Sequence, residues 1–230
     1  MVNKDTRILM IGASGRLGPH LLEFLRNEGF EVDCPSKKAC NVLNLESIES
    51  YIHAYRPKYV VNLAAYTSVI GAGKDKKECF DVNTVGAYNV QRACSRQGVW
   101  RLVHISSDYA KVPESGTYAM SKYLSEKLMT GMTVIIRTSF KERKTWGVKG
   151  NRVVPHPVYT NADWIDIIAP KIGAIIAKAW KYSGIVYVGT EKKTLLSLAK
   201  QEYPDVLPME LKEFRKLVGY DYPGDTTMPI

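Results

Sequence analysis

The stretch RILMIGASGRLG, residues 7–18, decides the fold. A short apolar run of this kind is typical of a strand buried on both faces, and a helical pattern of leucines follows it. Gly12, Gly15 and Gly18 stand between the two, where they permit a tight turn and a close backbone approach to a pyrophosphate. The free N–H groups of the helix's first turn attract phosphate. The stretch predicts a strand–turn–helix unit that binds a dinucleotide; a glycine turn with no ligand is the alternative.

The same alternation continues along the first half of the chain. Short apolar runs, at 29–34, 59–65, 100–106 and 133–139, alternate with helical patterns at 46–56, 76–97 and 117–129. Alternating strands and helices predict an α/β fold, a Rossmann-like doubly wound parallel sheet.

We expect two parts. Residues 1–140 are expected to form an NAD(P)-binding Rossmann-like domain, and residues 141–230 a small, trimmed C-terminal substrate-binding region. Within the second part, a helix at 163–181 and a strand at 184–189 are expected to pack back on the core. The polar stretch at 141–159 is expected to form loops, and 192–217 one or two short helices.

Composition limits the classes of protein. The chain has 230 residues, 45% of them hydrophobic and 24% charged, which argues against disorder, collagen and a disulfide scaffold. The net charge of +9 fits either a solvated basic surface or an anionic partner, a nucleic acid or a phosphate-bearing small molecule. We recognise no nucleic-acid-binding motif, no metal-ligand spacing among cysteines and histidines, and no apolar run of roughly 18 residues. We expect the protein to be cytoplasmic and to bind no metal, nucleic acid or membrane.

The residues after the second predicted strand bear on the choice of cofactor. An acidic residue there would bond the ribose of NAD, and a basic one would accommodate the 2′-phosphate of NADP. The chain has Lys37 and Lys38 at this position, while Asp33 lies earlier, inside the predicted strand. NADPH is therefore the expected cofactor, with NADH as the second option; a merely charged loop is the alternative.

Two tyrosine–lysine pairs share the helix predicted at 117–129. Tyr118 and Lys122 lie one turn apart, as do Tyr123 and Lys127, and only one pair can face a cofactor. A lysine ammonium one turn away favours the phenolate, so we expect it to lower the tyrosine pKa and to support proton transfer. The upstream segment HISSDY, residues 104–109, ends a strand at the edge where open α/β sheets bind ligands.

Five motifs, in order, resemble the extended short-chain dehydrogenase/reductase family. They are IGASGRLG at 11–18, VVNLAAYTSV at 60–69, DVNTVGAYNV at 81–90, HISSDYA at 104–110 and YAMSKYLSE at 118–126. Within that family the chain is most similar to the RmlD-like branch, the dTDP-4-dehydrorhamnose reductases, in the segments NLAAYTSV, ISSDYA, IIRTSF and YPGDTTM.

The resemblance assigns roles to individual residues. It implies that Tyr118 and Lys122 are the catalytic pair, because Glu126 follows Lys122 as in the family, and that Ser107 is the catalytic serine, with Ser106 its less favoured neighbour. The implied cofactor-binding residues are Gly12, Ser14, Gly15, Arg16, Leu17, Gly18, Lys37, Lys38, Ala64, Ala65, Tyr66, Asn83, Tyr118 and Lys122. The expected substrate-binding residues are Ser107, Tyr118, Asp225 and Thr226, and the segments 107–118 and 196–230 are expected to border the substrate.

The resemblance implies an NADPH-dependent reductase of a nucleotide-diphospho-4-keto-6-deoxy sugar, and a homodimer is the assembly considered. The chain departs from the family in a short loop, since only ten residues separate Ser107 from Tyr118, and Tyr109 stands where the family's dehydratases carry glutamate. Two alternatives stay open. One is a nucleotide-sugar epimerase or epimerase-reductase, for which His156 or Cys79 would supply the second acid–base group; the other is a non-catalytic NADP-binding regulatory protein.

Overall fold

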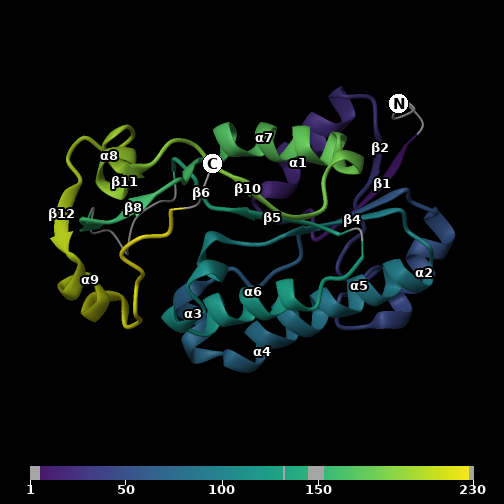
Figure 1. Cartoon of the computed structure of the whole chain (residues 1–230), viewed down its shortest axis with the longest axis horizontal. Helices are drawn as coiled ribbons and strands as arrows, with labels where there is room; N and C mark the ends of the chain where they lie inside the picture. Colours follow the sequence, from purple (N-terminus) through teal and green to yellow (C-terminus); the bar gives the residue numbers. More distant parts are fainter. Residues whose placement is uncertain (1–5, 132, 145–152, 228–230) are drawn as a thin grey trace.

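The computed structural model describes residues 6–131, 133–144 and 153–227. Its main feature is a parallel six-stranded sheet in the order β2–β1–β3–β4–β5–β10 (Figure 1). Its strands are β1 (Arg7–Ile11), β2 (Glu31–Asp33), β3 (Tyr59–Asn62), β4 (Arg101–Ile105), β5 (Val134–Thr138) and β10 (Gly184–Val188). The strand order reverses between β1 and β3, so the predicted doubly wound α/β sheet is confirmed.

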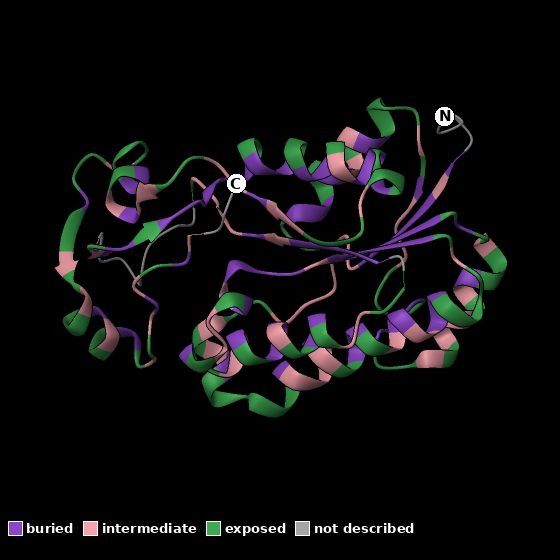
Figure 2. Cartoon of the chain, in the orientation of Figure 1, coloured by how far each residue is buried: buried purple, intermediate pink, exposed green. Residues whose placement is uncertain are grey.

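Helices cover both faces of this sheet. Along β1, Ile8 and Met10 face one apolar core, while Leu9 and Ile11 face the other. The first core is closed by α1 (Leu17–Asn27) and α7 (Ile165–Ala177), and the second by α2 (Leu45–Tyr55) and α5 (Ala87–Arg96). Figure 2 shows the buried residues concentrated on the sheet and on the helix sides that face it. Burial on both faces explains why the strands read as unbroken apolar runs.

One predicted helix is divided. Residues 76–97 were predicted as one helix. They form three consecutive helical segments: α4 (Lys76–Phe80), a π-helical segment (Asp81–Gly86) and α5. The helix α3 (Val69–Lys74) was not predicted, because its sequence VIGAGK contains two glycines and no helical periodicity. The helix α6 (Thr117–Lys127) packs beside the π-helical segment and follows two short 3₁₀ turns, Asp108–Lys111 and Pro113–Ser115.

The residues after 140 contribute both to the main sheet with its helices and to a small region beside it. The helix α7 lies against α1, and β10 pairs in parallel with β5 at the edge of the main sheet. A third 3₁₀ turn, Ala179–Lys181, joins these two elements. The remaining elements form a small C-terminal region beside the sheet (Figure 1). They are β6 (Phe140–Lys141), β7 (Val153–His156), β8 (Tyr159–Thr160), β9 (Asp163–Trp164), β11 (Lys193–Thr194), α8 (Leu195–Lys200), β12 (Leu207–Glu210) and α9 (Leu211–Val218).

The short strands of this region differ from the prediction. The stretch at 141–159 was expected to be all loop, yet it contains the end of β6, all of β7 and the start of β8; residues 145–152 lie outside the described residues. Strands of two to four residues are too short for alternation to reveal them, and they form only because β12 pairs with β7, β11 with β8 and β9 with β6. Among the described residues, no helix is long and apolar enough to cross a membrane, and no cluster of three or more potential metal ligands occurs.

Candidate active site

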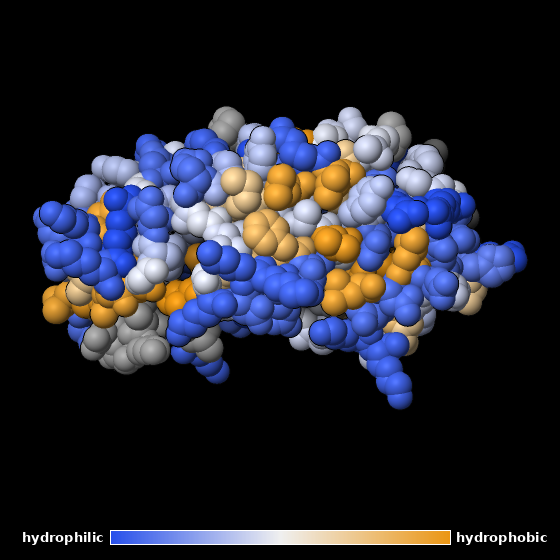
Figure 3. Space-filling model, turned by 90° about the horizontal axis from the view of Figure 1, so that it is seen from below, coloured by the Kyte–Doolittle hydropathy of each residue, from blue (hydrophilic) through white to orange (hydrophobic). Residues whose placement is uncertain are grey.

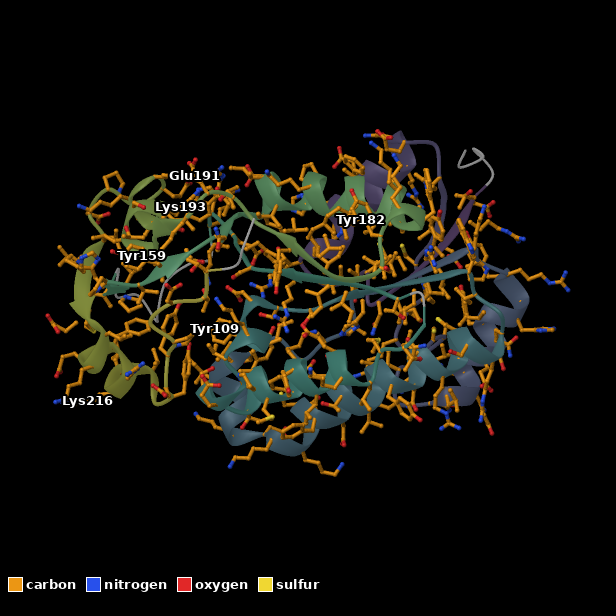
Figure 4. The ribbon with its side chains drawn as sticks, viewed as in Figure 1. Tyr109, Tyr159, Tyr182, Glu191, Lys193 and Lys216 are labelled. Carbon is orange, nitrogen blue, oxygen red and sulfur yellow. The ribbon has the colours of Figure 1, made fainter. Side chains whose placement is uncertain are left out.

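A cavity of about 900 Å³ lies at the carboxyl ends of the strands. The last residues of β1, β4 and β5, which are Ile11, Ile105 and Thr138, line it from the sheet. The C-terminal region lines the opposite side, with Tyr203, Phe214, Tyr220 and Tyr222 among its residues. Tyr109 lies at the junction of the two parts (Figure 4). Parallel sheets bind ligands at this edge, and the expectation that the segment after 196 borders the cavity agrees with this placement.

The glycine loop is shaped by the protein's own packing at two positions. A Cβ atom on Gly12 would lie 2.5 Å from the backbone N of Ala64, and one on Gly18 would lie 1.8 Å from the backbone O of Ala13. Gly15 differs, because a Cβ there would meet only Gly12 O, at an ordinary 3.5 Å. Among the residues that the structure describes, none lies close enough to require Gly15 to lack a side chain. The open space beside it fits a pyrophosphate group.

The start of α1 completes a site for an anion. Arg16 occupies the N-cap position without a side-chain hydrogen bond to the helix, and the first turn carries no acidic residue. Gly18 N donates to Gly15 O at 3.2 Å and Pro19 has no N–H, so the positive end of the helix dipole and the Arg16 side chain in the cavity lining are what this end of the helix offers a phosphate. These features fit the pyrophosphate of a dinucleotide cofactor.

Most of the predicted cofactor residues line the cavity, and two do not. Those that do are Gly12, Ser14, Gly15, Arg16, Leu17, Gly18, Lys37, Ala64, Ala65, Tyr66, Tyr118 and Lys122. Lys38 is exposed outside the cavity lining. Asn83 is buried behind the lining: its Oδ1 accepts from Tyr66 N at 2.8 Å, and its Nδ2 donates to Tyr66 O and to Ser121 Oγ. Asn83 therefore positions Tyr66 rather than facing the cavity itself.

The loop after β2 places Lys37, not an acid, at the cavity. The sequence suggests that Asp33 lies inside the second strand. In the structure β2 ends at Asp33, so this residue lies at the strand terminus. Its carboxylate accepts hydrogen bonds from the Tyr51 hydroxyl, at 2.6 Å, and from Cys34 N. Asp33 is outside the cavity lining, whereas Lys37 is part of it.

The three predicted catalytic residues come together at the cavity. Ser107 follows β4, and its Oγ accepts from Tyr109 N, so it caps the 3₁₀ turn that leads toward α6. Tyr118, on the first turn of α6, is hydrogen-bonded to the Ser107 side chain. Lys122 lies one turn later and donates from Nζ to Ile105 O at 2.8 Å. The short loop between Ser107 and Tyr118 therefore does not separate them.

The expected effect of Lys122 on Tyr118 is wrong for this structure. Burial raises the pKa of Tyr118 to about 12, and its hydrogen bond with Ser107 opposes this only in part. Burial also lowers the pKa of Lys122 to about 8. Desolvation disfavours the phenolate more strongly than its neighbours favour it. Tyr118 is therefore protonated at neutral pH, the form that a proton donor needs.

A buried ion pair acts electrostatically on Lys122 through its carboxylate, Glu126. Glu126 accepts from Arg137 through both oxygens at 2.6 to 3.1 Å, and its side chain is only 3% exposed. The Ser106 hydroxyl donates to the same carboxylate, so Ser106 is engaged away from the reacting centre. Sequence reasoning used Glu126 only as a marker and missed Arg137, although an arginine in a buried strand is itself a signal of a buried acid.

The competing tyrosine–lysine pair is separate from the cavity. Lys127 Nζ lies 5.0 Å from the ring centre of Tyr123, and neither residue lines the cavity. The choice of Tyr118 over Tyr123 therefore agrees with the geometry.

The predicted substrate contacts in the C-terminal segment are placed elsewhere. Asp225 is exposed, where it accepts from Lys192 Nζ and Thr227 N. Thr226 is buried, and its side chain is hydrogen-bonded to Asp108. Neither residue lines the cavity, because the β-bridge between Tyr159 and Asp225 fixes this segment behind it. The aromatic residues earlier in the tail occupy the position that these two were expected to hold.

The cavity favours an anionic ligand. Among the described residues that line it, the cationic side chains are Arg16, Lys37, Lys122 and Lys141, and the carboxylates are Glu78 and Glu142. Arg16 approaches Glu142 at 3.5 Å, which leaves the positive charges in excess. His156 and Cys79 are both absent from the lining, and Cys79 is buried against Ser121. The structure therefore offers neither as a second acid–base group for epimerisation.

Comparisons with known proteins agree with this geometry. Residues 6–112 match the family model described as the RmlD substrate binding domain. The chain is 34% identical over 151 residues to the spore coat polysaccharide biosynthesis protein SpsK of Bacillus subtilis, covering 59% of the chain and 53% of that relative. It is 28% identical over 214 residues to a dTDP-4-dehydrorhamnose reductase of Aggregatibacter actinomycetemcomitans, covering 85% of the chain and 68% of that relative. The chain thus spans between about half and two thirds of these relatives' length.

Solved structures share the fold over nearly the whole chain. A dTDP-4-dehydrorhamnose reductase of Bacillus anthracis in complex with NADP superposes with a TM-score of 0.82 at 24% identity, covering 96% of this chain and 89% of the other. A hypothetical dTDP-4-dehydrorhamnose reductase of Sulfolobus tokodaii gives 0.78 at 25% identity, covering 96% and 91%. These comparisons confirm the resemblance to the extended short-chain dehydrogenase/reductase superfamily and to its RmlD-like branch, the dTDP-4-dehydrorhamnose reductases.

Proposed function

We propose that the protein is an NADPH-dependent reductase of a nucleotide-diphospho-4-keto-6-deoxy sugar. The observation that carries this proposal is that Ser107, Tyr118 and Lys122 line the same cavity as the glycine loop that opens α1. The excess of cationic side chains in the cavity supports a ligand set that contains two diphosphates, one in the cofactor and one in the substrate.

Each catalytic residue has a task that its position allows. NADPH, when bound, supplies the hydride for the keto carbon. Tyr118, protonated at neutral pH, donates its proton to the oxygen that becomes the alcohol. Ser107 is hydrogen-bonded to Tyr118 and so orients the Tyr118 hydroxyl toward the keto oxygen. Lys122, held by Ile105 O one helical turn after Tyr118, supplies a cation to the cavity that holds the reacting groups.

The relatives support the substrate class. Reductases named for dTDP-4-dehydrorhamnose match this chain in sequence, and one with the same fold has been solved with NADP. The 4-keto-6-deoxy sugar is therefore the substrate to test first. We propose that the domain of residues 1–140 binds the cofactor and that the C-terminal region, which lines the opposite side of the cavity, covers the sugar, while α7 and β10 complete the sheet and its helix layer.

The test is turnover of a panel of nucleotide-linked keto sugars. The purified protein is incubated with NADPH and each sugar, and the loss of the reduced nicotinamide absorbance is followed. We expect turnover with a dTDP-linked 4-keto-6-deoxy sugar. Tight NADPH binding with no turnover across the panel would contradict the reductase and favour a regulatory NADP-binding protein.

Replacing Lys37 by Ala is expected to weaken NADPH binding about tenfold and to leave NADH binding nearly unchanged. The side chain lines the cavity next to the end of β2, and a charge-assisted bond to the 2′-phosphate is worth roughly 1.5–3 kcal/mol. Lys38→Ala is the matched control, since Lys38 is one residue away but outside the lining. Both dissociation constants are measured by titration at fixed salt. Equal losses for NADPH and NADH, or a loss at Lys38 alone, would refute the role of Lys37.

We also propose that the protein acts in the cytoplasm as a homodimer. The face formed by the π-helical segment, α5 and α6 exposes Val85, Tyr88, Met120 and Leu124. Figure 3 looks onto the molecule from this side and shows apolar side chains between charged ones. Light scattering is expected to give a dimer for the unaltered chain and a monomer for Leu124→Lys. A monomer in both cases would contradict this assembly.

A further inference from the structure

Asp108 is a buried carboxyl group to which the proposed reaction gives no role. It follows Ser107 directly and is only 2% exposed. Ser107 Oγ donates to Asp108 Oδ1 at 3.1 Å, and the Thr226 side chain and Tyr109 N also bond to the carboxyl group. Burying a carboxyl group is costly unless such partners are present. Its contact with Ser107 connects it to the reacting centre.

Tyr118, Ser107 and Asp108 form one chain of hydrogen bonds. Tyr118 is bonded to the Ser107 side chain, and Ser107 is bonded to Asp108. Each hydroxyl has one hydrogen to donate, so the state of the carboxyl group fixes the direction of the whole chain. An ionised Asp108 only accepts, so Ser107 donates to it, and the Tyr118 hydrogen is drawn toward Ser107. A neutral Asp108 donates to Ser107, which then donates to the Tyr118 oxygen and leaves the Tyr118 hydrogen directed at the cavity.

We propose that Asp108 is a positioning residue whose neutral form, acting through Ser107, leaves the Tyr118 hydrogen directed at the substrate carbonyl and whose ionised form draws that hydrogen toward Ser107. This inference rests on the reductase function proposed above. It also gives a task to the C-terminal segment, since Thr226 holds the carboxyl group from behind.

The charged and titratable groups around Asp108 determine where it ionises. Lys141 of β6 faces it with an ammonium group, Tyr118 approaches from α6, and Tyr109 and Tyr222 border it on the C-terminal side. Arg16 acts on it indirectly through Lys141. Burial raises the pKa of Asp108, while Lys141 and the bonds from Thr226 and Ser107 lower it, and the net shift is upward. Reduction should therefore slow as the pH rises above the usual range of carboxyl groups.

Two substitutions at Asp108 distinguish the direction of the hydrogen bonds from the packing of the side chain. Asparagine keeps the shape and carries a permanent donor for Ser107, whereas alanine removes the contact. At pH values below the Lys122 pKa of about 8, we expect kcat of the unaltered enzyme to fall as pH rises and kcat of Asp108→Asn to show no such fall. In the same range, kcat of Asp108→Ala should be about tenfold lower throughout, with KM little changed. A pH profile of Asp108→Asn that falls like that of the unaltered enzyme would overturn the proposal.

Thr226→Val is the matched control behind the carboxyl group. It removes a hydrogen bond that favours the ionised form, and Thr226 does not line the cavity. The fall in kcat should therefore move to higher pH. An unmoved profile would contradict the arrangement.

A second readout keeps this inference apart from the proposed function. If the unaltered protein reduces no keto sugar, the function fails, and the Asp108 carboxyl is followed by ¹³C NMR, its signal assigned by loss in Asp108→Asn. We expect a titration midpoint above the usual carboxyl range that moves higher in Ser107→Ala, because the Ser107 bond favours the ionised form. A midpoint in the usual range, or one that Ser107→Ala leaves in place, would overturn the hydrogen-bond chain itself.

Discussion

Replacing Tyr118 by Phe is expected to lower kcat for keto-sugar reduction by about 10²–10⁴-fold, the usual contribution of a positioned acid. The substitution removes the proton donor and its bond to Ser107 but keeps the ring against Tyr109, whose centre lies 5.8 Å away. NADPH affinity should change little, because the glycine loop and the start of α1 are untouched. Steady-state kinetics and an NADPH titration measure the two effects separately.

Tyr123→Phe is the matched control for this variant. Tyr123 lies on the same helix with a lysine at the same spacing, yet it packs with Lys127 outside the cavity. Its kcat should stay within about twofold of the unaltered enzyme, as expected for a substitution away from the reacting groups. Equal losses in the two variants would mean that the helix, and not the Tyr118 hydroxyl, carries the effect.

Replacing Gly18 by Ala is expected to lower the free energy of unfolding by about 3 kcal/mol, the upper range for overpacking. The new Cβ would meet the backbone O of Ala13 at 1.8 Å, and backbone cannot move aside as a flexible side chain can. The start of α1 would have to shift, so NADPH binding should be lost as well. Urea unfolding and NADPH titration measure the two losses.

Gly15→Ala separates cofactor binding from folding. The added Cβ would meet its nearest atom at 3.5 Å, so stability should be unchanged or rise by about 0.4–1 kcal/mol. The same Cβ would occupy the space that fits the pyrophosphate, and NADPH affinity should fall at least tenfold, or about 1.4 kcal/mol. Unchanged NADPH affinity in Gly15→Ala would place the cofactor elsewhere.

The parts of the molecule that the sequence predicts well are those determined by local pattern. The apolar strands, the helices between them and the glycine turn all follow from periodicity and composition, because each strand is buried on both faces. The proposed catalytic residues were placed in one cavity by motifs whose spacing fixes their positions on one helix and one strand end. The helix α3 and the short strands β6 to β9 could not be predicted from the sequence pattern. The helix contains two glycines, and the strands are regular only because they pair with distant segments.

The errors within the site have a common physical cause. Local sequence suggested that Lys122 sets the pKa of Tyr118, but desolvation depends on how the C-terminal region closes over the cavity. In the same way Asp225 and Thr226 were expected to face the substrate, while the pairing of Tyr159 with Asp225 turns their segment behind the site. Asn83 was assigned to the cofactor although its amide is fully used in holding Tyr66 and Ser121. Burial and long-range pairing are not visible in a motif.

The transfer of a deuterium label tests the central claim most directly. NADPH labelled at the transferable position of its nicotinamide is incubated with the protein and a dTDP-linked 4-keto-6-deoxy sugar, and the product is examined by mass spectrometry and NMR. A reductase of the kind proposed here gives a product that carries one deuterium at C4, with one NADPH oxidised for each sugar reduced. A product that is an unlabelled stereoisomer of the keto sugar, formed without net loss of NADPH, would contradict it.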